Sequence, residues 1–353
     1  MNSSNGMSKP LVTVLMPCYN ASKFLNEAME SILNQTYRNL EVLAIDDGSS
    51  DNTIEIIRKY AEMDSRVKPV VNEVNLGLIK TLNKGCDLAK GVFIARMDSD
   101  DISEPDRIEC LVDALESDPS VSLVSAGCYR ISESGKQLSR VHPKACLSKA
   151  MKFVSFFLTP VLHPCVIFRS SMIEENRFDE DYLHSEDYEL FSRLLLSGVN
   201  FSNLDKPLYR LRINFHSVSH KFEAIQISTH NRISFRNIND YFGIQYDYFV
   251  QRVMTNRINF SVPPNLLKES LDNLDKLRML YIQKENPSQL ELEDIDGFLI
   301  EQRIDIHIQS LKNSNGWLVA YHLFACIRSW RLFFSPRGIQ FLKSKNWFKK
   351  QQY

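Results

Sequence analysis

The chain has 353 residues, of which 44% are hydrophobic and 24% are charged, and its formal net charge is −1. These values are typical of a globular protein that is long enough for one large domain with an appendage, or for two domains. A net charge near zero provides no global basic field, so the composition does not favour nucleic acid as a partner.

The first hundred residues alternate short apolar runs with segments of helical spacing. The expected strands are 11–16, 40–45, 67–71 and 92–97, and the expected helices are 23–33, 53–63 and 78–89. Near-continuous apolar strands separated by helices are typical of a parallel sheet that is covered on both faces. Ligands of such sheets bind beyond the carboxyl ends of the strands.

The alternating pattern continues and then gives way to helices. The sequence predicts, in order, a helix over 107–115, a strand over 121–124, a loop or hairpin over 132–150, a strand over 161–168 and a helix over 187–196. After about residue 225, the amphipathic segments 266–283 and 290–311 predict a helical C-terminal part. We therefore expect two regions, 1–225 and 226–353.

Cysteine usage and the absence of long apolar runs bear on localisation. Seven cysteines occur without a Cys-x-x-Cys pair, and residues 1–10 lack the hydrophobic core of a secretory leader. Reduced thiols in a cytoplasmic protein are therefore expected. The longest uncharged apolar stretch, Trp317 to Ile327, is shorter than the roughly 18 residues that span a bilayer. We expect a soluble or peripherally bound protein.

Carboxylates cluster where the second and fourth expected strands end. Asp46 and Asp47 follow the second strand, and Asp98, Asp100 and Asp101 follow the fourth. Such a concentration of acids is costly unless a cation or hydrogen-bond donors meet them. In extended backbone alternate side chains point the same way, so Asp98 and Asp100 can address one hard cation. A divalent metal with a sugar nucleotide meets this requirement, although an isolated Asp-x-Asp pattern is also common in solvated loops.

The loop 46–51 has two interpretations. Gly48 and Asp51 are typical of a turn followed by a helix N-cap. That interpretation does not explain two adjacent acids at a strand terminus, where a carboxylate can accept a hydrogen bond from the imide N–H of a nucleobase. Tyr19 follows the first expected strand, where its ring either stacks on a base or covers the sheet edge.

These pieces, in this order, resemble the inverting family 2 glycosyltransferases with the GT-A fold. The matching stretches are 12–20, 31–36, 41–51, 75–77, 95–101 with Pro105 and Arg107, 163–169, 185–190 and 209–219. The resemblance covers about residues 10–220 and not the C-terminal third. It implies an α/β fold with a mostly parallel central sheet flanked by helices, followed here by a helical C-terminal extension.

The resemblance implies a donor site and a metal site. The nucleobase pocket would be lined by Pro17, Tyr19 and Asp47, with Asp46 beside them, and Asn20 and Ser99 would also bind the donor. Asp98 would approach the ribose or the metal, and His216 would lie in a loop that closes over the diphosphate. Asp100 would be the principal ligand of Mn²⁺ or Mg²⁺, with Asp98 as a second ligand.

The resemblance also implies a general base. Asp187 would deprotonate the acceptor hydroxyl, and such bases contribute roughly 10²–10⁴-fold to the rate. Its position at the start of an expected helix has a structural alternative, because an acid there stabilises the helix N-terminus. One displacement from the face opposite the leaving group would invert the anomeric centre.

The implied activity is the transfer of one hexose or N-acetylhexosamine from a nucleotide-diphosphate sugar, expected to be UDP-linked. The expected acceptor is a saccharide on a polyprenyl diphosphate lipid, in capsule, O-antigen or exopolysaccharide biosynthesis. Processive family members carry a Gln-x-x-Arg-Trp motif and membrane spans, and neither occurs in this sequence.

Three alternatives remain open. The first is transfer of the sugar directly to polyprenyl phosphate. The second is a nucleotidyltransferase, although such enzymes usually carry a Gly-rich phosphate loop where this chain has residues 17–20. The third is a non-catalytic module that binds nucleotide sugars.

The C-terminal tail has a distinctive composition. Residues 328–353 contain seven Lys or Arg and no Asp or Glu, with Trp and Phe residues interleaved. This mixture predicts a surface that rests on the anionic cytoplasmic face of the inner membrane. The alternative is an amphipathic helical pair that turns its aromatic side chains inward.

Overall fold

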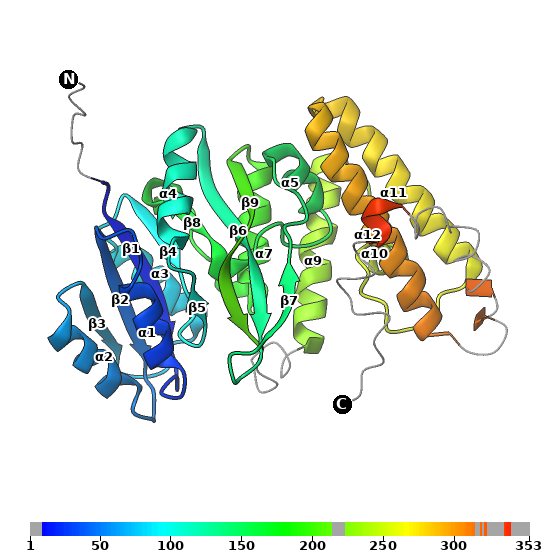
Figure 1. Cartoon of the computed structure of the whole chain (residues 1–353). Helices are drawn as coiled ribbons and strands as arrows, with labels where there is room; N and C mark the ends of the chain where they lie inside the picture. Colours follow the sequence, from blue (N-terminus) through cyan, green and yellow to red (C-terminus); the bar gives the residue numbers. More distant parts are fainter. Residues whose placement is uncertain (1–8, 214–222, 315–317, 320, 323–334, 340–353) are drawn as a thin grey trace, which may run out of the picture. The chain divides into compact units, whose positions relative to one another are not determined.

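The computed structural model describes residues 9–213, 223–314, 318–319, 321–322 and 335–339 (Figure 1). The chain forms two compact units. Unit 1 comprises Met1–His142, Val161–Leu190 and Asn200–Phe215, and unit 2 comprises Pro143–Pro160, Phe191–Val199 and His216–Tyr353. Two segments of unit 2, 143–160 and 191–199, are therefore inserted within the sequence of unit 1, and the rest of unit 2 follows residue 215.

Unit 1 contains the sheet, whose strands follow the order β3-β2-β1-β4-β8-β6-β9-β5, with β7 paired to β6. The strands are β1 (Val12–Cys18), β2 (Leu40–Asp47), β3 (Val67–Asn72), β4 (Phe93–Arg96), β5 (Ile102–Ser103), β6 (Val121–Ile131), β7 (Gln137–Val141), β8 (Ile167–Arg169) and β9 (Asn200–Arg212). Strands β3, β2, β1 and β4 run parallel, as the sequence predicts. Beyond β4 the sheet is mixed, because β8 runs antiparallel to both β4 and β6.

Helices cover both faces of the parallel strands. The helices that begin in unit 1 are α1 (Leu25–Leu33), α2 (Thr53–Met63), α3 (Leu78–Leu88), α4 (Arg107–Ser117), α6 (Ser170–Glu174) and α7 (Glu186–Leu196). Helices α1, α2 and α4 pack on the face that receives Val12, Val14 and Met16 of β1. Helix α3 packs on the opposite face, where a Cβ at Gly85 would lie 2.1 Å from Leu15 Cδ1. The acidic strand ends are thus held by a well-packed α/β core.

Unit 2 is helical in its described residues. Its helices are α5 (Ser148–Val154), α9 (Glu223–Phe242), α10 (Tyr248–Met254), α11 (Pro264–Glu285) and α12 (Gln289–Lys312). Helices α11 and α12 form an antiparallel pair (Figure 1), and Ser288 and Glu291 make a capping box at the start of α12. Both helices confirm that 266–283 and 290–311 are helical, but α12 is not amphipathic as predicted, because it is buried on more than one side.

An aromatic cluster joins α5 to the long helices of unit 2. Phe153 lies 5.2 Å, centroid to centroid, from Tyr281 of α11, and Phe157 lies 5.7 Å from Phe298 of α12. Phe156 lies 6.0 Å from Tyr281. Because these side chains are buried, the segment that precedes β8 in sequence belongs to the core of the helical unit.

Two parts of the sheet differ from the sequence prediction. The strand expected over 161–168 is a 3₁₀ helix, η1 (His163–Cys165), followed by the short β8, because Pro164 has no N–H to donate to a ladder. Strand β9 was not predicted, since Pro207 and several charged residues interrupt its apolar alternation. Its pairing with β6 also shifts register on either side of Gly127.

Some predictions lie outside the described residues or remain untested. His216 and most of the basic-aromatic tail are not among the residues that the structure describes. The predicted division at 225/226 stays a prediction. Within the described residues, every helix is too short or too polar to cross a bilayer.

Candidate functional site

Asp46 and Asp47 end β2 with side chains that are almost completely buried, 3% and 4% exposed. Asp47 Oδ1 accepts hydrogen bonds from Asn72 Nδ2 at 2.7 Å and from the backbone N–H of Leu76 at 2.9 Å. Asp47 Oδ2 accepts from the backbone N–H of Gly77 at 3.0 Å. The Asp47 carboxylate therefore ties the loop after β3 to the end of β2.

The close approach of these two loops depends on Gly48. Its φ is +69°, and a Cβ there would lie 2.6 Å from the backbone nitrogen of Asn75. Any other residue would strain the backbone and push the two loops apart.

The loop after β1 is fastened to the same place. The backbone N–H of Asn20 donates to Ser49 Oγ at 2.9 Å, and Asn20 Oδ1 accepts from the backbone N–H of Ser50 at 2.9 Å. Next to this joint, the ring of Tyr19 is 53% exposed. Asp51 accepts from the N–H of Thr53, while the N-cap position of α2 is occupied by Asn52. Three loops thus meet around Asp47, with an exposed aromatic ring beside them.

A second acidic cluster follows β4. Asp98, Asp100 and Asp101 each offer a carboxylate oxygen, and these oxygens all lie within 4.8 Å of one another. Burial, together with the negative charge of Asp98, raises the pKa of Asp100 to about 6. Crowded carboxylates of this kind fit a hard divalent cation, which prefers oxygen ligands and removes the repulsion among them.

Arg96 interacts with this cluster and also influences the start of α7. Its side chain is 5% exposed and forms an ion pair with Asp98. Burial raises the pKa of Asp187 and raises that of Glu186 to about 7, the latter also through the charge of Asp187. The Arg96 guanidinium opposes both shifts, which places Glu186 and Asp187 within its electrostatic reach. The first turn of α7 therefore faces the same charged region as Asp98.

Cys18 links the two acidic clusters. Burial raises the pKa of its thiol strongly, and the negative charges of Asp46 and Asp98 add to the shift. The Ser99 side chain acts in the opposite direction and lowers the pKa of the same thiol. The ends of β2 and β4 thus approach each other at Cys18, and the convergence of all the predicted site residues on one cleft stays a prediction.

The structure also records contacts that bear on the alternatives. Asp187 Oδ1 accepts from the backbone N–H of Tyr188 at 2.7 Å, so Asp187 does interact with the helix N-terminus, as its structural alternative predicts. Among the described residues, no hydrogen bond is made to the second oxygen of this half-buried carboxylate. Pro17 is half-buried at the end of β1 and shapes the turn that presents Tyr19.

Sequence reasoning missed three residues that organise the site. Glu186 directly precedes Asp187, and the sequence alone gives no reason to assign it a separate role. Asn72 holds Asp47 and gives no signal in the sequence beyond its place at a strand end. Arg212 resembles any charged residue of a strand, yet its side chain is completely buried. Its backbone N–H donates to Asp101 Oδ1 at 2.6 Å, and its Nε donates to the carbonyl oxygen of Asp100 at 2.7 Å.

We expect Arg212→Lys to loosen the acidic loop. The guanidinium also donates to the Glu133 carbonyl at 2.6 Å and lies 4.3 Å from the centroid of the Phe24 ring. An ammonium cannot make these contacts together, so the free energy of unfolding should fall by about 1.5–3 kcal/mol, as for lost bonds to a charged group. Arg210→Lys on the same strand is the control, since Arg210 is half-exposed and bonds Glu104 at the surface. Urea denaturation followed by circular dichroism measures both, and equal effects would contradict this role for Arg212.

Glu186→Gln should change the pH dependence of stability. The folded-state pKa of Glu186 is about 7 against an ordinary 4.5, so its contribution to stability is present below pH 4.5 and is lost as the pH rises through 7. Glutamine imitates the protonated form. The free energy of unfolding of the variant, relative to that of wild type, should therefore increase by about 2 kcal/mol when the pH is raised from 5.5 to 8.5. Urea denaturation in EDTA at both pH values measures this gain. Glu174→Gln, at an exposed position, should show none, and a pH-independent difference for Glu186→Gln would rule the shift out.

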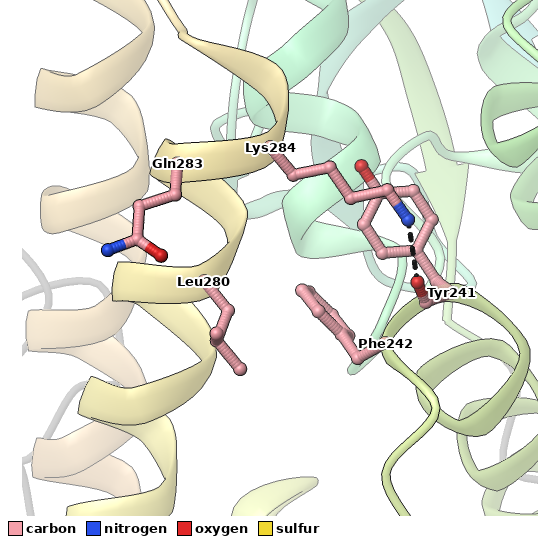
Figure 2. Close-up of a pocket in the computed structure, with 5 residues that line it drawn as sticks. All are labelled: Tyr241, Phe242, Leu280, Gln283 and Lys284. Carbon is pink, nitrogen blue, oxygen red and sulfur yellow. Dashed lines mark hydrogen bonds between the residues drawn. The ribbon is translucent and has the colours of Figure 1, made fainter.

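Unit 2 contains a pocket of about 300 Å³, and the residues that line it are distant in sequence from the two acidic clusters. Figure 2 shows its lining residues, Tyr241, Phe242, Leu280, Gln283 and Lys284. Lys284 Nζ donates to the Tyr241 carbonyl oxygen at 2.8 Å, which closes one side of the pocket. None of the predicted site residues that the structure describes lines it.

Comparisons with known proteins agree on one group. The family described as glycosyl transferase family 2 matches residues 13–178. An uncharacterized glycosyltransferase of Haemophilus influenzae is 32% identical over 241 residues, which is 66% of this chain and 74% of that protein. A chondroitin synthase of Escherichia coli is 29% identical over 231 residues, which is 64% of this chain but 32% of that enzyme.

Solved structures agree at the level of the fold. The structure of S. aureus TarS 1-349 in complex with UDP has a TM-score of 0.52 and 18% identity, and the match covers 83% of this chain and 91% of that one. The complex of the same protein with UDP-GlcNAc has a TM-score of 0.52 and 17% identity, with coverage of 91% and 92%.

Proposed function

The chain belongs to glycosyl transferase family 2 and is a glycosyltransferase with the GT-A fold, and on this premise we propose that it transfers one hexose or N-acetylhexosamine from a UDP-linked donor to a saccharide acceptor. The proposal depends above all on one observation. Arg96 forms an ion pair with Asp98 of the acidic cluster and lowers the pKa of Asp187 at the start of α7, which supports a shared location for the proposed metal site and the proposed base.

The donor half of the site is proposed to hold the nucleotide through Asp47 and Tyr19. Tyr19 offers an exposed ring, and stacking of a base on such a ring is worth about 1–3 kcal/mol in nucleic-acid systems. The joint between Asn20 and Ser49 fixes the spacing between that ring and the Asp47 carboxylate. UDP is the ligand in the TarS complex named above, which favours a uridine donor here.

Asp98 and Asp100 would hold Mn²⁺ or Mg²⁺, with Asp101 beside them. The bound ion would supply positive charge to the departing diphosphate. Asp101 is already engaged by the N–H of Arg212, so it contributes mainly to the shape of the loop.

Asp187 is proposed to take the proton from the acceptor hydroxyl. The transition state of sugar transfer has oxocarbenium character, like that of glycoside hydrolysis. Burial raises the pKa of Asp187 and brings it nearer the working pH, which suits a general base. Attack from the side of Asp187, opposite the leaving diphosphate, would invert the anomeric centre.

The acceptor is proposed to be a saccharide carried on a polyprenyl diphosphate at the cytoplasmic face of the inner membrane, in surface-polysaccharide assembly. One relative is named a chondroitin synthase, which favours a saccharide acceptor. The basic-aromatic composition of residues 328–353 favours contact with an anionic leaflet. The family assignment argues against a nucleotidyltransferase and against a non-catalytic module, and it leaves transfer to polyprenyl phosphate as the alternative acceptor chemistry.

A panel of nucleotide sugars tests the proposal. We expect Mn²⁺-dependent release of UDP from one UDP-hexose or UDP-N-acetylhexosamine when a lipid-linked saccharide is supplied. Radiolabel from the donor should then appear in a lipid-linked saccharide of increased length. Label in lipid phosphate would favour the alternative acceptor, and release of GDP in place of UDP would overturn the proposed donor.

A further inference from the structure

The hydrogen bonds that Asp47 already accepts determine how many more its carboxylate can accept from a ligand. An ionised carboxylate has about four acceptor positions, two on each oxygen. Asn72 Nδ2 and the Leu76 N–H fill both positions on Oδ1, and the Gly77 N–H fills one position on Oδ2. Among the described residues, no donor occupies the second position on Oδ2.

We propose that Asn72 sets the base selectivity of the donor site by limiting Asp47 to this one position. A single position fits the imide N–H of uracil or thymine and does not fit the paired donors of guanine. This inference rests on the proposed role of Asp47 in holding the base. It makes Asn72 a specificity-determining residue that does not itself need to touch the ligand.

The orientation of the Asn72 amide is fixed by its partners. Nδ2 donates to Asp47 Oδ1 and, at 3.0 Å, to Thr81 Oγ1, while Oδ1 accepts from Lys84 Nζ at 2.6 Å. A lysine ammonium can only donate and an ionised carboxylate can only accept. A flipped Asn72 amide would therefore place its oxygen against the Asp47 carboxylate and its NH₂ group against the Lys84 ammonium. Asn72 is 4% exposed and Thr81 is fully buried, so water cannot replace these bonds without opening the core.

The two backbone donors are equally constrained. The Leu76 and Gly77 N–H groups lie on a loop whose neighbouring segment, at Val74 and Asn75, packs directly on Gly48. Neither N–H can leave the carboxylate unless this loop withdraws from the end of β2. A ligand therefore meets an Asp47 that is already oriented.

The four bases present different edges to such a carboxylate. Uracil and thymine place one N–H between two carbonyls. Guanine places a ring N–H beside an amino group, and this pair would need one free position on each carboxylate oxygen. Adenine and cytosine place a ring acceptor beside their amino group, so a carboxylate would face a lone pair. A site rejects a ligand strongly when binding that ligand would leave buried polar groups unpaired or would place like groups against each other.

The test compares UDP with GDP on the full-length protein. Isothermal titration in Mn²⁺ should show that wild type binds UDP at least about 100-fold more tightly than GDP. Asn72→Ala frees a position on Oδ1, so the ratio of the two affinities should fall at least about 10-fold, with weaker UDP binding and GDP binding unchanged or tighter. Asn26→Ala, at an exposed position on α1, is the control and should keep the wild-type ratio.

Two further variants keep the outcomes separable. Lys84→Met removes the donor to the Asn72 oxygen and should also lower the ratio of UDP affinity to GDP affinity. It therefore provides the test if Asn72→Ala does not fold. Asp47→Asn should lose UDP affinity. If Asp47→Asn binds UDP as wild type does, the proposed role of Asp47 fails. If Asp47→Asn loses UDP while Asn72→Ala and Lys84→Met keep the wild-type ratio, the donor site stands and the role of Asn72 is wrong.

Discussion

Asp187→Asn should lower turnover at least about 100-fold while leaving the Kd for the donor unchanged, because it removes the acceptor of the proton and keeps the shape of the side chain. The amide oxygen can still accept the Tyr188 N–H, so the start of α7 should survive the substitution. Steady-state kinetics with saturating donor, together with calorimetric titration of UDP, measure the two quantities. Normal turnover by Asp187→Asn would refute its assignment as the base.

Glu186→Gln is the matched variant for this experiment. Glu186 is adjacent, buried and also carries a raised pKa, so it is the other carboxylate able to accept a proton there. We expect Glu186→Gln to reduce turnover less than tenfold. If Glu186→Gln loses turnover and Asp187→Asn retains it, the two residues exchange roles and the base lies one position earlier in α7.

Asp100→Ala should abolish both activity and the dependence of donor affinity on metal. Asp100 belongs to the group whose oxygens lie within 4.8 Å of one another, and its removal takes away a ligand that the remaining carboxylates cannot replace. Titration of UDP with and without Mn²⁺ should show a clear gain in affinity for wild type and none for the variant. Because the pKa of Asp100 is about 6 without metal, the Mn²⁺-dependent gain for wild type should also weaken as the pH falls below 6.

Asp113→Ala on the exposed face of α4 is the control for the metal experiment. It removes one negative charge from the same unit without touching the cluster, so both activity and the metal-dependent gain should persist. Retention of the metal-dependent gain by Asp100→Ala would show that the metal binds elsewhere. Loss of affinity without metal would instead indicate that the variant has damaged the nucleotide site itself.

The sequence was sufficient to find both acidic clusters, because the position of a residue at the end of a parallel strand follows from the chain alone. Asp46 and Asp47 end β2, Asp98 and Asp100 follow β4, and β1 lies between these strands. Their proximity required only that adjacent parallel strands end at the same edge of the sheet. The helical spacing of 53–63 was likewise clear, and α2 has the predicted bounds.

Long-range polar contacts could not be predicted from local pattern. Arg212 reaches Asp100 and Asp101 across more than a hundred residues, and nothing near it in the sequence distinguishes it from the exposed Arg210. The same holds for Asn72, whose importance arises from Asp47 and Lys84. Strand β9 escaped prediction for a related reason, since its pairing with β6 tolerates Pro207 and a shift of register.

The aromatic cluster of unit 2 has a practical consequence for making fragments of this enzyme. Phe153, Phe156 and Phe157 are contributed by the excursion 143–160, while Tyr281 and Phe298 come from the C-terminal helices. A recombinant fragment that stops near residue 225 would retain the first three rings and lose the other two. The fragment would expose an apolar patch to solvent, and such patches promote aggregation. Expression of residues 1–225 alone therefore requires polar replacements at these phenylalanines, or shortening of segment 143–160.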